Sequence, residues 1–252
     1  MKIDFPSARH MIQQRALWHE AFGDTDWFLD CFFRTAYSPD QCRCVIIVDE
    51  IAAILYWIDC TVADQKLAYI YAVVTHPMHR GKGLCRMLMT DTHNLLRSRG
   101  YAGAILVPQQ EGLRKMYAGM GYQDVGSLTQ FSCSAADTPI PLRAIGPSEF
   151  ARLRRTMLPQ NSVIQEGAGL AFLSEQLQFY AGDGFICAAY GENNVLSVPE
   201  LLGDHAAAPG ILKALNHSRG NFRFPGGNTR FAMFCPLTDW AVTPSYFGFA
   251  FD

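Results

Sequence analysis

The sequence lacks an excess of charge of either sign, and it has no apolar run long enough to cross a membrane. Lysine and arginine together number 21, against 23 aspartates and glutamates, whereas nucleic-acid-binding proteins generally show a basic excess. No apolar run approaches the roughly 20 residues of a membrane-spanning helix, and residues 1–14 lack the apolar core of a signal peptide. We therefore expect a cytoplasmic protein with no nucleic-acid partner and no membrane partner.

The sequence also lacks the cysteine spacing that is typical of zinc sites. None of the eight cysteines belongs to a Cys-x-x-Cys pair, and most of them lie inside apolar runs. Such cysteines behave as small buried hydrophobic residues in a reducing compartment. We expect no metal on this basis, although the sequence alone leaves a zinc site or a disulfide framework open.

Length and composition favour a globular protein of one large domain or two small ones. The 252 residues are 49% hydrophobic and 17% charged, which excludes a disordered chain. A segment rich in proline and glycine, 135–147, separates two patterned regions and indicates a linker. We predict a first domain over residues 1–134 and a second over 148–252.

The first region alternates strands and helices. Apolar spacing predicts helices over residues 11–22, 27–34, 83–99 and 111–120, and strands over 43–48, 51–58, 67–74 and 102–107, with a last strand leading to residue 133. The order is three strands, a helix, a strand, a helix and a strand. It favours an α/β (α+β) fold with one β–α–β crossover.

The second region loosely repeats this order. The pattern predicts helices over residues 149–157, 170–180 and 208–216, and strands over 185–190, 195–202, 222–224, 230–234 and 246–251. In the last of these strands, Phe247, Phe249 and Phe251 alternate with small residues, as on one face of a sheet. We therefore expect a second, smaller α/β domain.

One turn of the first region carries a phosphate-binding pattern. After the predicted strand, residues 76–86 read HPMHRGKGLCR, and a helix then begins. The first N–H groups of a helix have no partner within the helix, and the helix dipole favours an anion there. Gly81 and Gly83 let a phosphate approach the backbone. Three basic residues add positive charge: Arg80, Lys82 and Arg86.

Two common phosphate loops do not fit this turn. A nucleotide P-loop needs Ser or Thr after its lysine, but Gly83 follows Lys82. A dinucleotide fingerprint needs a third glycine at position 86, which is Arg86.

The turn resembles the coenzyme loop of the GCN5-related N-acetyltransferases, the GNAT family. Residues 80–85, RGKGLC, resemble the family pattern Arg/Gln-x-x-Gly-x-Gly/Ala, with Cys85 at the last small position. Residues 113–122, LRKMYAGMGY, resemble the later family motif, a helix with Tyr-x-x-x-Gly-Phe/Tyr. Both motifs occur in the family's order, which makes residues 1–133 similar to a GNAT domain. The resemblance implies a mixed, mostly antiparallel sheet with flanking helices, followed by a second, smaller and degenerate GNAT-like α/β domain.

The resemblance implies a co-substrate and the residues that hold it. Acetyl-CoA, with no metal, would lie along the strand that ends near Thr75, with its diphosphate on the turn. A backbone N–H near residues 73–75 would polarise the thioester carbonyl. The implied coenzyme-binding residues are Val73, Val74, Thr75, Arg80, Gly81, Lys82, Gly83, Leu84, Cys85 and Arg86.

Tyr117 is the general acid that the resemblance implies. Acetyl transfer to an amine expels a thiolate, and a phenol with a pKa of about 10 can protonate it. The alternative is that Tyr117 only positions the coenzyme arm. The general base stays open, because each candidate is better explained as a turn, surface or phosphate-contacting residue: Asp49, Glu50, Asp59, His76 and His79.

A GNAT unit followed by a second, degenerate unit resembles the enhanced-intracellular-survival type of acetyltransferase. In that type the C-terminal carboxylate enters the active site as a base, so Asp252 becomes a second catalytic candidate; an ordinary surface end is the alternative. The turn at residues 202–209 has no Arg-Gly-x-Gly, so we expect no second coenzyme site. Aromatic residues of the second domain could form one wall of an acceptor pocket.

The predicted function is transfer of an acetyl group from acetyl-CoA to an amine by direct attack. We interpret Cys85 as structural and not as a nucleophile. The alternatives are transfer of another acyl group or to a hydroxyl, and a catalytically silent acyl-CoA-binding regulatory module. We expect an amine-bearing acceptor, a small molecule ahead of a protein; a polyamine, an aminoglycoside, an amino acid and a protein amine all stay open.

Overall fold

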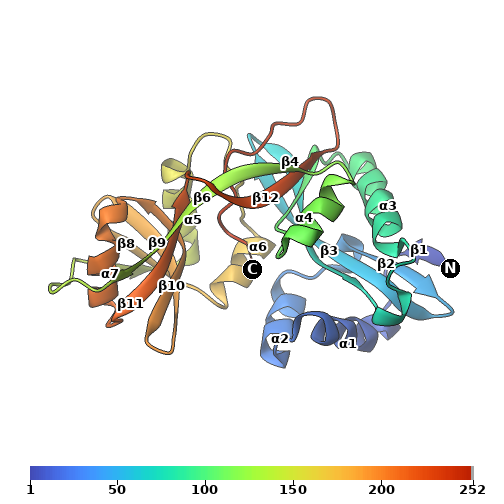
Figure 1. Cartoon of the computed structure of the whole chain (residues 1–252), viewed down its shortest axis with the longest axis horizontal. Helices are drawn as coiled ribbons and strands as arrows, with labels where there is room; N and C mark the ends of the chain where they lie inside the picture. The colour runs from blue at the N-terminus through green and yellow to red at the C-terminus, as the bar shows by residue number, and fades with distance from the viewer. Residues whose placement is uncertain (251–252) are drawn as a thin grey trace.

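Strands from both halves of the chain join one twelve-stranded sheet in the computed structural model, which describes residues 1–250 (Figure 1). The strand order is β1-β2-β3-β4-β5-β12-β6-β11-β10-β9-β8-β7. Only two neighbouring pairs are parallel, β4 with β5 and β10 with β11. The fold is therefore the predicted mixed α/β class with a largely antiparallel sheet.

The elements of the first half follow the predicted order, except that the short strand β1 was not predicted. They are β1 (Lys2–Asp4), α1 (Met11–Phe22), α2 (Asp26–Thr35), β2 (Cys42–Ile47), β3 (Glu50–Val62), β4 (Gln65–Thr75), α3 (Leu84–Ser98), β5 (Gly103–Leu106), α4 (Glu111–Ala118) and β6 (Gln123–Ser134). Side chains alternate across β3. Tyr56 packs against Trp18 of α1, whereas Trp57 belongs to the cluster that contains Leu88 of α3. Helices α1 and α3 therefore cover opposite faces of the sheet.

The second half has a similar order of elements. They are β7 (Arg143–Ile145), α5 (Pro147–Met157), α6 (Ala168–Ser174), β8 (Gln178–Gly182), β9 (Phe185–Glu192), β10 (Val195–Gly203), α7 (Ala208–Ala214), β11 (Arg219–Pro225) and β12 (Thr229–Pro236). The unit β8-β9-β10-α7-β11 repeats the unit β2-β3-β4-α3-β5, including the single parallel pair at its end. The second half is thus a smaller copy of the same topology.

Two predicted elements of the second half are wrong. The helix over residues 170–180 stops at Ser174, because residues 178–182 pair with both β7 and β9 as strand β8. No strand covers residues 246–250: Tyr246 makes only an isolated bridge to Ser162, and its ring folds over Gly248. Phe247 and Phe249 are both buried, so their alternation with small residues reflects packing and not a strand.

Strand pairing crosses the predicted domain limits. Strand β12 inserts between β5 and β6 of the first half, and β6 pairs with β12 along its first part and with β11 along its second (Figure 1). Strand β7 lies inside the predicted linker, 135–147, and pairs with β8. The domain limits stay a prediction, but the two halves share one sheet.

A buried ion pair holds the second half to its final segment. The Arg154 guanidinium donates to both carboxylate oxygens of Glu200, at 2.6 and 2.9 Å, and both side chains are almost fully buried. The Tyr246 hydroxyl donates to Glu200 at 3.0 Å. One step along the chain, Phe247 packs edge-on against Tyr69 of β4, with ring centroids 4.9 Å apart. The network therefore fixes the segment that supports β4.

All eight cysteines are unpaired and six of them are buried. Across residues 1–250, no cluster of three or more His, Cys, Asp or Glu side chains could hold a metal ion. No helix in those residues is both long and apolar enough to cross a membrane.

Candidate active site

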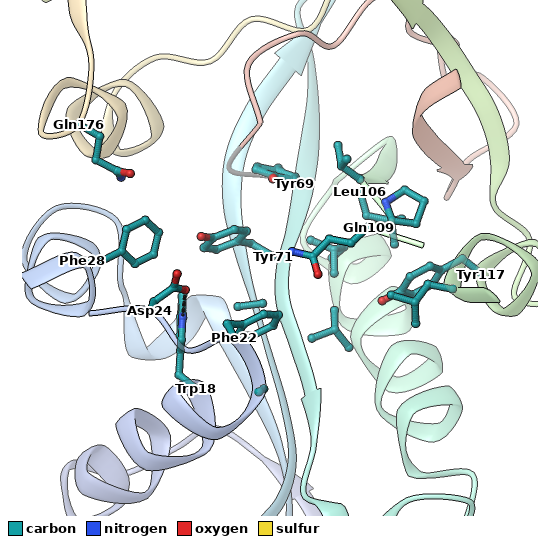
Figure 2. A pocket seen from close by; sticks show the side chains of 17 residues that line it. Trp18, Phe22, Asp24, Phe28, Tyr69, Tyr71, Leu106, Gln109, Tyr117 and Gln176 are labelled. Atoms are coloured by element: carbon teal, nitrogen blue, oxygen red, sulfur yellow. Dashed lines mark hydrogen bonds between the residues drawn. The ribbon is translucent and has the colours of Figure 1, made fainter. Parts of the chain in front are cut away.

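The site begins where β4 and β5 stop pairing. Their parallel ladder runs only from Leu67 opposite Gly103 to Tyr69 opposite Ile105. Beyond Tyr69 the two strands separate, and a cavity of about 320 Å³ opens between residues 70–73 and 106–109 (Figure 2). A ligand that enters there can reach the edge of β4.

A bulge in β4 lies at this cavity. Ala72 has a φ of +46°, which is strained for a residue with a side chain. The register between β3 and β4 shifts at the same place. Such bulges re-aim backbone and side chains beside functional sites. As a result, Val73 lines the cavity, whereas the neighbouring Val74 is buried in the core cluster.

The turn after β4 leaves room around its glycines. Gly81 and Gly83 have φ values of +76° and +75°, which side-chain-bearing residues rarely adopt. Added Cβ atoms there would meet nothing within 4 Å. Helix α3 begins directly after Gly83, so the N–H groups of its first turn lack earlier helical carbonyls. The turn thus presents open backbone and a positive helix end.

Two basic side chains brace this turn and stay exposed. The Arg80 Nε donates to the carbonyl of Thr75 at 3.1 Å, and the Lys82 ammonium donates to that of Met78 at 2.9 Å. Neither forms an ion pair within residues 1–250. Both positive charges therefore remain available to an anion at the start of α3.

The next three predicted residues have different surroundings. Leu84 is buried and Cys85 is half-buried against the core beneath α3, so only their backbone can face an anion. Burial raises the pKa of the Cys85 thiol, which keeps it protonated and fits a structural role. The Arg86 guanidinium donates to the carbonyl of Gly119 at 2.7 Å and so connects α3 to the end of α4.

Tyr117 projects from α4 into the cavity (Figure 2). Its side chain is 6% exposed. Burial, with a smaller contribution from Cys85, raises the pKa of Tyr117 far above its usual value, so the phenol keeps its proton. Within residues 1–250 its hydroxyl has no hydrogen-bond partner. The ring packs edge-on against Tyr122, whose hydroxyl lies 2.9 Å from Nε2 of His93.

Among the residues that the structure describes, the predicted base candidates do not line this cavity. Asp49 lies in an exposed turn and pairs with Arg9. Asp59 accepts a hydrogen bond from Tyr101 at 2.6 Å and pairs with Lys66. Asp252 lies outside the described residues.

Sequence reasoning missed the carboxylate that does line the cavity, Asp24. It accepts a hydrogen bond from the Trp18 indole at 2.8 Å and lies beside Phe28 and Tyr71 (Figure 2). Residues 24–26 predict a cap for the helix that follows. The cap is Thr25, whose hydroxyl accepts from the N–H of Phe28, so the Asp24 carboxylate is not used as a cap. The sequence signal for such a carboxylate was therefore an acidic residue one position before the cap residue.

The comparisons identify the domain that carries this geometry. Residues 3–125 match the model of the acetyltransferase (GNAT) domain. The first half of the chain is therefore a GNAT acetyltransferase domain, and enzymes with this domain use acetyl-CoA as co-substrate. No curated protein matches the chain.

Several solved structures share the fold across both halves. A GCN5-related N-acetyltransferase from Kribbella flavida is 16% identical with a TM-score of 0.71, and the match covers 94% of this chain and 72% of that one. Eis1 from Mycobacterium abscessus is 12% identical with a TM-score of 0.66, and the match covers 94% and 73%. A tandem GNAT protein from the clavulanic acid biosynthesis pathway is 12% identical with a TM-score of 0.57, covering 94% and 99%.

Proposed function

We propose that this protein transfers the acetyl group of acetyl-CoA to an amine by direct attack, with Tyr117 as the general acid. The observation that carries the proposal is the position of the buried Tyr117 phenol, which lines the cavity where β4 and β5 separate. That cavity adjoins the open, basic turn at the start of α3. A small-molecule acceptor and a cytoplasmic location stay predictions.

The turn suits the diphosphate of coenzyme A. The space around Gly81 and Gly83 admits a bulky anion to the backbone, and Arg80 and Lys82 supply charge-assisted hydrogen bonds. The pantetheine arm would lie along residues 70–75 of β4. Arg86 is the least direct of the proposed coenzyme contacts, because it already bonds to Gly119.

In the proposed reaction, Tyr117 donates a proton and Asp24 can accept one. The amine nitrogen forms a bond to the acetyl carbon while the carbon–sulfur bond breaks. An ammonium group first loses one proton to water, so that the attacking amine is neutral. The Tyr117 hydroxyl gives its proton to the departing sulfur, and the second proton that the nitrogen loses passes to the Asp24 carboxylate or to water. Solvent then returns a proton to Tyr117, which leaves N-acetylated product and free coenzyme A.

Asp24 is suited to receive a cationic amine. Its carboxylate faces the cavity beside the aromatic rings of Trp18, Phe28 and Tyr71 (Figure 2). Carboxylates and aromatic faces both attract ammonium groups. Burial, then Tyr69 and then Asp24 raise the pKa of Tyr71, so this phenol also stays neutral.

Acetyl transfer to a panel of primary amines tests the proposal. We expect Tyr117→Phe to lower kcat by about 10²–10⁴-fold, the usual contribution of a general acid, with acetyl-CoA affinity nearly unchanged. Tyr180→Phe, which removes a phenol outside the cavity, is the matched control. Normal turnover in Tyr117→Phe would remove the acid role. Acetyl-CoA binding without turnover on any amine would favour the silent binding module.

A further inference from the structure

A second cavity, of about 680 Å³, lies in the second half. It opens at the end of the other parallel pair, where Val198 lies opposite Phe222 and β10 then separates from β11. A register shift between β9 and β10 lies at the same place. The repeated topology therefore produces a second opening at the position equivalent to the first cavity.

This second cavity does not suit a second coenzyme. The turn after β10 carries Asp204, whose carboxylate caps the N–H of Ala206 at 2.9 Å. The cavity wall combines apolar side chains with neutral polar ones, among them Gln130, Ser132 and Asn221 on adjacent strands. Its one basic side chain, Arg223, lies over the ring of Phe231. The Ser132 hydroxyl donates to the side-chain oxygen of Asn221 at 2.7 Å, which directs the Asn221 amide group to other partners.

Aromatic side chains complete the wall. Trp27 of α2 is 57% exposed and Tyr190 of β9 is 44% exposed, and both line the cavity. Neutral hydrogen-bonding groups beside aromatic faces suit a ligand with hydroxyl or amide oxygens. An aliphatic chain would leave these polar groups unpaired.

Gln176 lines both cavities. Figure 2 shows its side chain directed from the end of α6 toward Phe28. Its amide nitrogen is buried and has no hydrogen-bond partner within residues 1–250. A buried donor without a partner is unfavourable, so a ligand oxygen that reaches this position would be favoured.

Contacts between α2 and α6 fix the position of Gln176. Phe28 packs edge-on against Phe172, with ring centroids 5.3 Å apart. Arg34 pairs with Glu175 at 2.9 Å, which neutralises the one acidic side chain of the second cavity wall. The side-chain amide of Gln176 therefore lies where α2 of the first half packs against α6 of the second half.

We propose that the second cavity binds the tail of the acceptor and that Gln176 determines specificity by donating a hydrogen bond to an oxygen on that tail. The acceptor is thus an amine with a neutral, oxygen-bearing tail, whose amine lies near Asp24. This inference rests on the proposed function for the identity of the ligand as acceptor. A sugar amine and a small peptide amide both have this chemistry.

Calorimetric titration of the full chain, without acetyl-CoA, tests the proposal. The probes are methyl glucosaminide, glycylserinamide and hexylamine, of which the last has no oxygen. We expect at least one oxygen-bearing probe to bind about tenfold more tightly than hexylamine, and the stronger of the two identifies the tail. Gln176→Met should lower that affinity about tenfold and leave hexylamine binding unchanged.

Two further variants complete the design. Gln123→Met changes an exposed glutamine outside both cavities and should alter nothing. Asn221→Ala, on the exposed sheet face, should weaken the oxygen-bearing probe selectively even if Gln176→Met fails to fold. Equal affinity of the wild-type protein for all three probes, no binding of any, or equal losses in the variants would overturn the proposal. Selective binding without acetyl transfer would overturn only the proposed function.

Discussion

The turn after β4 and the turn after β10 occupy equivalent places in the two halves, yet their chemistry is opposite. The first has two open glycines and exposed Arg80 and Lys82. In the second, Gly203 packs directly against the backbone of Gly184, and Asp204 uses its carboxylate as a cap. One topology therefore provides an open, basic turn in the first half and a closed turn in the second. The ability of each half to receive an anion therefore depends on the residues of the turn and not on the shared topology.

The largest effect on stability should come from the second half. Arg154→Met leaves the Glu200 carboxylate buried without its ionic partner. We expect a loss of about 3–5 kcal/mol in the free energy of unfolding, measured by urea denaturation. The double variant Arg154→Met/Glu200→Leu should recover most of this loss. A double variant as unstable as the single one would contradict the account.

Charge reversal should weaken acetyl-CoA binding when it is made in the turn after β4 and should leave it unchanged when it is made in the second half. Arg80→Glu with Lys82→Glu should weaken acetyl-CoA binding about 100-fold, because two charge-assisted contacts to phosphate are replaced by repulsion. The matched control is Lys213→Glu with Arg219→Glu, two exposed basic residues of the second half. Calorimetric titration gives both affinities. Equal losses in the two double variants would show that the first turn is not the anion site.

The loss of folding stability at low pH should arise from His93 in the first half. Burial lowers the pKa of His93 on α3 to about 4, so the native state holds it neutral while the unfolded chain takes up a proton below about pH 6.5. Stability is therefore full above pH 6.5 and falls as the pH drops toward 4. His93→Gln, which keeps a partner for Tyr122, should reduce this fall by roughly 2–3 kcal/mol. Unfolding curves at pH 7 and 4 measure it; parallel losses in both proteins would contradict the assignment.

Replacing a turn glycine by alanine should have the smallest effect on stability and binding. Gly83→Ala adds a Cβ into open space at positive φ, so we expect a loss of about 1 kcal/mol in unfolding free energy and about tenfold weaker acetyl-CoA binding. Gly203→Ala places its Cβ against Gly184 and should destabilise the fold more, without changing coenzyme affinity. Thermal unfolding and titration of both variants decide this. Unchanged coenzyme binding in Gly83→Ala would mean that the open space is not used.

Local patterns predicted most of the elements and the first turn. The proposed anion site is continuous in sequence, so Gly81, Gly83 and the basic residues were recognisable from spacing alone. The insertion of β12 between β5 and β6 was not recognisable in this way, because pairing between β5 and β12 joins residues more than 120 positions apart. Asp24 and Gln176 were missed for the same reason: only the packing of α2 against α6 brings them to one cavity. The strand expected at 246–251 failed because alternation of Phe with small residues does not distinguish pairing from irregular packing.

Thermal unfolding with and without acetyl-CoA determines whether the coenzyme binds at the first turn. At 100 times its dissociation constant, a ligand stabilises the native protein by about 2.7 kcal/mol. We expect acetyl-CoA to raise Tm clearly and the Arg80→Glu/Lys82→Glu variant to lose that shift, with NADH and ATP as controls. An equal shift with ATP, or no shift with acetyl-CoA in a folded protein, would contradict the account.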